Sequence, residues 1–60
     1  MLSDYCFKLE TGEYVFVEMP DGERISNVKA YLEGQIDCNI VSFVGIYSPE
    51  EAEMLGYDTY

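Results

Sequence analysis

The sequence predicts a small α+β fold: a three-stranded antiparallel sheet with one main helix packed on one face and a short C-terminal helix, in the order ββαβα. Three observations predict it. Two alternating apolar runs flank a glycine turn within residues 4–19, apolar residues then recur at spacings of three and four, and a β-branched, aromatic run follows at 40–47. With 60 residues the chain can form only one domain, residues 1–60, with a thin margin of stability.

Residues 4–19 are expected to form a β-hairpin. Gly12 suits the left-handed position of a type I turn followed by a G1 bulge, which pairs Leu9 with Glu13 and places Phe7 opposite Val15. One face then carries the apolar set Tyr5, Phe7, Leu9, Val15, Val17 and Met19, and the other carries Cys6, Lys8, Tyr14, Phe16 and Glu18. A slip of one residue would mix the two sets, so this register is preferred.

A helix is expected after the turn at residues 20–22. Its apolar stripe, at helical spacing, consists of Ile25, Val28, Leu32 and Ile36. Ser26 is the candidate N-cap, and Gly34 either weakens the helix or marks its end. The alternative is a small all-β barrel in which Glu23 to Leu32 continues as a strand after the turn.

The run at residues 40–47 is apolar on both faces, which indicates a central or well-covered strand. A right-handed crossover places it beside the first strand, giving the strand order 2-1-3. Ser48, Pro49 and Glu51 then form a helix start with a capping box, and Gly56 is a C-cap candidate. The last four residues, 57–60, are expected to form a polar-aromatic tail.

The charge is the strongest signal in the composition. Twelve acidic residues outnumber three basic ones, giving a net charge of −9, while apolar residues make up 48% of the chain. This combination indicates a folded core with an acidic shell rather than a disordered acidic segment. Such a shell repels nucleic acid and membranes and attracts basic surfaces. The expected partner is therefore a basic protein, most plausibly a nucleic-acid-binding one, with no direct contact to nucleic acid.

No arrangement of residues in the sequence indicates catalysis. The chain has no histidine, and neither Cys6 nor Cys38 has neighbouring basic residues that would activate a thiol. Two cysteines without histidine do not make a zinc site, and the isolated glycines match no phosphate-binding loop. We expect no enzyme, metal or cofactor, and we expect reduced thiols in a cytoplasmic protein, since the start of the chain does not resemble a signal peptide.

Two features favour binding to a protein. The sheet face away from the helix carries aromatic residues, which should lie near outward residues of the third strand, either Phe43 and Tyr47 or their neighbours. Acidic residues also gather at the turns and on the terminal helix. The expected partner-binding residues are Glu10, Glu13, Tyr14, Phe16, Asp21, Glu23, Tyr47, Glu50, Glu51 and Glu53. The alternatives are that the terminal helix and tail complete the core, and that the acids only keep the chain soluble.

In length, charge and compactness the chain resembles small acidic inhibitors encoded by phages and mobile elements, including DNA mimics, anti-CRISPR proteins and inhibitors of host DNA enzymes. No motif carries this resemblance, so it gives no residue a role. It implies an acidic inhibitor that occupies the basic, nucleic-acid-binding surface of a partner protein. The alternative function is a small homodimeric structural or regulatory module, joined through the open sheet face or a strand edge.

Overall fold

The computed structural model describes all 60 residues and contains a four-stranded sheet in the order β3-β1-β2-β4. The strands are β1 (Leu2–Leu9), β2 (Tyr14–Pro20), β3 (Ile40–Tyr47) and β4 (Asp58–Thr59). The α+β class and the placement of β3 beside β1 agree with the sequence prediction. The prediction of three antiparallel strands was incomplete, because β4 adds a fourth strand that runs parallel to β2.

The hairpin has the predicted register. The backbone N–H of Leu9 donates to the Glu13 carbonyl at 2.8 Å, and Gly12 takes a φ of 91°. Phe7 consequently pairs with Val15, and residues on each strand alternate between the two faces as expected. The hairpin therefore fixes which side chains enter each layer of the core.

Helix α1 (Ile25–Glu33) packs on one face of the sheet, and the alternative of an all-β barrel is wrong. Val28 and Leu32 are fully buried there, in a core shared with Tyr5, Phe7, Leu9, Val15 and Val17. The N-cap is Arg24 rather than Ser26, and no side chain caps the helix at that position. Ser26 lies inside the first turn because the helical hydrogen bonds begin at the Arg24 carbonyl, which accepts from the Val28 N–H at 3.1 Å. Gly34 ends the helix.

Strand β3 lies at an edge of the sheet, as the predicted order 2-1-3 implies, but the prediction of a central or well-covered strand is wrong. Register shifts in its ladder with β1 leave Val41 and Val44 without a direct partner, as bulges. Val41, Val44 and Ile46 are 60%, 43% and 55% exposed. The β-branched composition of this run reflects strand formation, but neither helix extends far enough to cover the whole strand.

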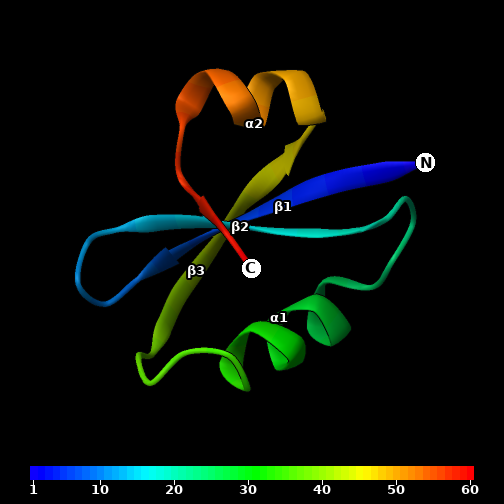
Figure 1. Cartoon of the computed structure of the whole chain (residues 1–60). Helices are drawn as coiled ribbons and strands as arrows, with labels where there is room; N and C mark the ends of the chain where they lie inside the picture. Colours follow the sequence, from blue (N-terminus) through cyan, green and yellow to red (C-terminus); the bar gives the residue numbers. More distant parts are fainter.

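Helix α2 (Pro49–Leu55) lies on the opposite side of the sheet from α1 (Figure 1). Its predicted capping box is present: the Ser48 hydroxyl accepts from the Glu51 N–H at 3.2 Å, and the Glu51 carboxylate accepts from the Ser48 N–H at 3.4 Å. Gly56 closes the helix with a φ of 72°. Ala52 packs on Cys6 and Phe16, which makes a second, smaller core on this face.

The residues after α2 are part of the sheet. The N–H of Tyr60 donates to the Phe16 carbonyl at 2.8 Å, and the ring of Tyr57 stacks on Tyr14 with centroids 5.5 Å apart. The prediction of a tail was therefore wrong for these residues. The backbone hydrogen bonds that β2 offers along its outer edge hold them in place.

The two cysteines lie on opposite sides of the sheet. Cys6 is buried under α2, whereas Cys38 packs against the core on the α1 side, and both thiols are free. Neither α1 nor α2 has the length and apolar character that crossing a membrane requires.

Candidate functional site

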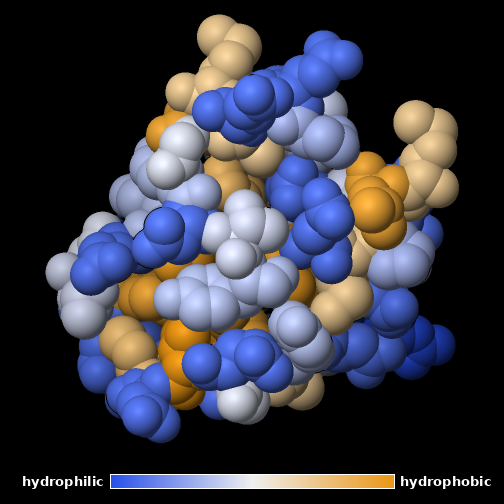
Figure 2. Space-filling model, viewed as in Figure 1, coloured by the Kyte–Doolittle hydropathy of each residue, from blue (hydrophilic) through white to orange (hydrophobic).

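The acidic residues that the sequence groups at the turns lie at opposite ends of the hairpin. Glu10 and Glu13 are at the turn between β1 and β2, where the Glu10 carboxylate accepts from the Asn39 side-chain amide at 3.2 Å. Asp21 and Glu23 follow the other end of β2 (Figure 1). The hydrophilic surface is accordingly divided into several groups with hydrophobic residues between them (Figure 2). A single partner can contact all these groups only by reaching around the domain.

The aromatic residues do not form an open sheet face. Phe16 is fully buried, with its ring 5.7 Å from Tyr47 and 5.5 Å from Tyr57. Phe43 lies on the other face, 5.4 Å from Phe7, because the bulges of β3 change which of its residues face α1. Phe16 therefore belongs to the core and has no surface left for a partner. Tyr14, which is 37% exposed, keeps a partly accessible ring.

The glutamates of α2 point to different sides of the helix. Glu53 lines a pocket beside β1 and β2, whereas Glu51 lies near Tyr47, Met54 and Leu55. Glu51 is also committed to the capping box. Glu50 is exposed in the first turn, where a carboxylate interacts favourably with the helix dipole.

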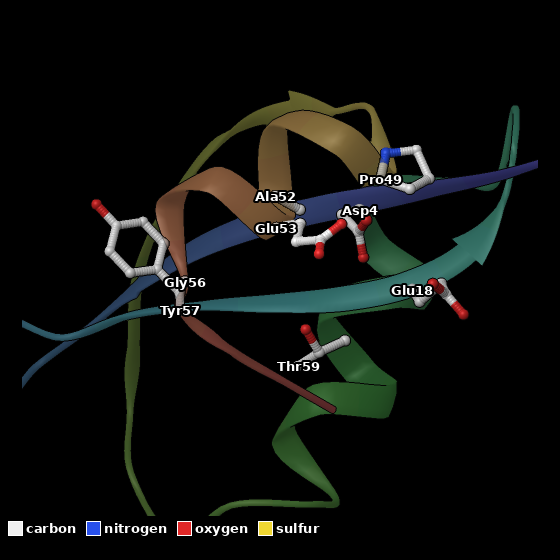
Figure 3. A pocket seen from close by; sticks show the side chains of 8 residues that line it. All are labelled: Asp4, Glu18, Pro49, Ala52, Glu53, Gly56, Tyr57 and Thr59. Carbon is white, nitrogen blue, oxygen red and sulfur yellow. The ribbon is translucent and has the colours of Figure 1, made fainter.

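The pocket beside α2 brings together carboxylates from three elements. It has a volume of about 250 Å³, and its lining contains no lysine or arginine. The lining residues are Asp4, Glu18, Pro49, Ala52, Glu53, Gly56, Tyr57 and Thr59. The carboxyl groups of Asp4 and Glu53 project from β1 and α2 into the same space, with Glu18 further along β2 (Figure 3). This pocket is the most acidic concave feature of the molecule.

Asp4 is the unusual member of the pocket, because it is only 3% exposed. Burial, followed by the negative charge of Glu18, raises the pKa of the Asp4 carboxyl. Neither a hydrogen bond nor a cation is among the influences on this pKa. Every fully enclosed side-chain oxygen in the molecule has a hydrogen-bond partner. The Asp4 carboxylate has no such partner, so it must still be in contact with water, and the pocket provides that contact.

Asp4 and Glu18 were not among the predicted site residues, although the hairpin register contained a signal for them. The same pairing that places Phe7 opposite Val15 places Asp4 directly opposite Glu18. Like charges in directly opposite positions destabilise a sheet, so such a pair is unusual and indicates a candidate functional position. The covering of Asp4 by α2 and by residues 57–59 depends on tertiary structure, and the hairpin pattern does not contain it.

The chemistry available to this site is that of anionic side chains. No group of three or more His, Cys, Asp or Glu residues is arranged to hold a metal ion. Burial raises the pKa of the Cys6 thiol, which disfavours the reactive thiolate. No protein family, curated protein or solved structure matches this chain. We therefore interpret the site from its geometry and charge.

Proposed function

We propose that this protein is an acidic inhibitor that binds the basic, nucleic-acid-binding surface of another protein. The observation that carries the proposal is the excess of twelve carboxylates over three cations on a well-packed core. Each DNA strand carries one phosphate per roughly 3.4 Å of axis, and this chain presents twelve carboxylates on a molecule of 28 × 23 × 16 Å. A folded surface that carries many carboxylates can therefore approach the charge density of nucleic acid.

The distribution of the acids supports a surface that wraps into a groove rather than a flat patch. Glu10 and Glu13 lie at one end of the hairpin, Asp21 and Glu23 lie at the other, and the glutamates of α2 lie on different sides of that helix. The molecule measures only 28 × 23 × 16 Å along its principal axes, so a groove that encloses the domain spans more than one of these groups. A basic groove that normally encloses a nucleic acid could contact several of them together.

The proposal is tested by capturing partners from a bacterial lysate at low salt and measuring whether the chain displaces nucleic acid from the captured protein. We expect stoichiometric displacement that weakens as salt rises, because exposed charges are screened over about 10 Å at 0.1 M salt. Replacing Glu50, Glu51 and Glu53 together with glutamine should weaken binding roughly tenfold at low salt, since each exposed charge contributes about 0.5 kcal/mol. A second variant replaces Asp21 and Glu23 with their amides.

Lys29→Gln provides the matched control, because it changes one exposed charge in the opposite direction. This variant should bind as tightly as the parent, or more tightly. If both charge-neutralised variants bind like the parent and binding does not depend on salt, the inhibitor proposal is wrong and the acidity serves only solubility.

A homodimeric module is the second candidate, favoured by the exposed edge of β3. This strand carries no charged residue over Ile40–Tyr47, although the chain as a whole has a charge of −9. It is therefore the part of the surface where two copies can approach with the least repulsion, and antiparallel pairing about a two-fold axis is self-complementary. We place this candidate second because β3 contains two bulges, and bulges hinder the addition of another strand to a sheet edge.

For this second candidate we expect self-association that strengthens with salt, since screening reduces the repulsion between acidic copies. Sedimentation at low and high salt would measure it, and Ile46→Lys on the exposed edge should yield monomers. This dependence on salt is opposite to that of binding to a basic partner. A monomer at high protein concentration in high salt would exclude the dimer.

A further inference from the structure

The pocket beside α2 leaves a buried negative charge without a partner. Asp4 is 3% exposed and lies directly opposite Glu18 in the hairpin. Glu53 adds a third carboxyl group from α2, and no cationic residue lines the space. A buried charge is normally paired or hydrogen-bonded, because removing an ion from water costs free energy.

A cation that entered the pocket would supply the missing partner. The pocket keeps Asp4 in contact with water, so a ligand can reach its carboxylate without unfolding the chain. Most of its lining comes from β1, β2 and α2, and residues after α2 complete it. The two strands are paired by hydrogen bonds, and α2 packs on them through Ala52. Sites on such elements are held more rigidly than sites on loops.

The size and spacing of the pocket favour an organic cation over a metal ion. The carboxylates are not arranged to coordinate one ion together. A volume of about 250 Å³ greatly exceeds the roughly 30 Å³ that one water occupies in the liquid. A guanidinium group spreads its charge over a planar fork of five N–H donors. It can therefore donate two parallel hydrogen bonds to one carboxylate and still reach another carboxylate that is set apart from the first.

We propose that this pocket receives the guanidinium group of one arginine side chain on the surface of a partner protein. The proposal rests on the proposed function and deepens it, since it names the residue type that the acidic surface recognises. Asp4 would accept hydrogen bonds from the buried end of the guanidinium, and Glu18 and Glu53 would contact it nearer the mouth. Arginine is common on nucleic-acid-binding surfaces, where it contacts phosphates and bases.

The test that needs no partner uses N-acetyl-arginine amide as the probe, with the neutral citrulline and the cationic lysine counterparts as controls. Carboxyl NMR spectra of the full chain should show shifts at Asp4, Glu18 and Glu53 with arginine, with a dissociation constant on the order of 1 mM for so small a ligand. Bound arginine should also lower the pKa of Asp4, because a nearby cation favours the carboxylate. Equal binding of citrulline or lysine would overturn the assignment.

Variants then separate the pocket from the rest of the acidic surface. Asp4→Asn should abolish the NMR response to arginine, whereas Glu50→Gln on the exposed side of α2 should leave it unchanged. Glu53→Gln provides a second pocket variant if Asp4→Asn alters the fold. An unchanged response in both pocket variants would show that arginine binds elsewhere and would overturn the proposal.

The same variants measured against the captured partner separate this inference from the proposed function. Asp4→Asn should weaken partner binding at least about thirtyfold, as loss of one member of a buried charge pair does, and Glu50→Gln at most about fivefold. If the partner binds both variants like the parent, the pocket proposal fails while the inhibitor proposal stands. If arginine binds the pocket but no nucleic acid is displaced from any partner, the inhibitor proposal fails while the pocket stands.

Discussion

Replacing Phe16 with alanine is expected to destabilise the fold by about 3–5 kcal/mol, because it empties a fully buried site between the sheet and α2. A chain of this size has a total stability of roughly 3–9 kcal/mol, so much of the population should unfold. The ring of Phe16 contacts both Tyr47 and Tyr57, and its loss removes the surface on which α2 and the C-terminal residues pack. Chemical denaturation followed by circular dichroism would measure the change.

Tyr14→Ala is the matched control for this prediction. Tyr14 lies two residues away on the same face of β2 and also stacks on Tyr57, but it is 37% exposed. We expect a loss of about 1 kcal/mol, since only part of its side chain leaves water on folding. Equal effects of the two substitutions would show that α2 does not cover Phe16 in solution.

Asp4→Asn is expected to raise the melting temperature at pH 7. Folding raises the pKa of Asp4, so the folded chain holds this proton to a higher pH than the unfolded chain does. The charge on Asp4 therefore destabilises the folded chain at pH values above the pKa of Asp4 in the folded state. It has no such effect at pH values below the ordinary carboxyl pKa of about 4, where Asp4 is protonated in both states. The gain from asparagine should shrink as the pH falls, and it should vanish once Asp4 is protonated in both states.

Thermal unfolding of the parent and of Asp4→Asn at several pH values would measure this difference. Asp37→Asn, in the exposed loop before β3, should leave the melting temperature close to that of the parent at every pH. Glu18→Gln should bring the pKa of Asp4 closer to its ordinary value, because the charge of Glu18 contributes to the shift. A lower melting temperature of Asp4→Asn at pH 7 would contradict the cost assigned to the buried charge.

Local patterns in the sequence predict most of the regular structure. Gly12 and the alternation around it determine the hairpin register, and Ser48, Pro49 and Glu51 determine the start of α2, because each signal acts within a few residues. The exposure of β3 and the pairing of β4 could not be predicted in this way. Both depend on how far α2 reaches across the sheet, and Asp58–Thr59 has no pattern of its own that indicates a strand.

The candidate site was less predictable than the fold. The sequence shows that Glu53 belongs to an acidic helix, but its meeting with Asp4 and Glu18 requires α2 to fold back over the hairpin. Phe16 was expected to bind a partner because alternation places it away from α1, and alternation does not show whether a second layer covers that face. The directly opposed pair Asp4 and Glu18 was the one part of the pocket that followed from the register alone.

The parallel pairing of β4 with β2 has a consequence for the order in which the chain can fold during synthesis. The partners Val15 and Asp58 are 43 positions apart in sequence, so this contact closes a long loop. The outer edge of β2 therefore stays unpaired until residues 58–60 have been synthesised, although the hairpin and α1 can already be in place. Until then the nascent chain exposes one edge of β2, which the Tyr60 N–H later covers in part by donating to the Phe16 carbonyl.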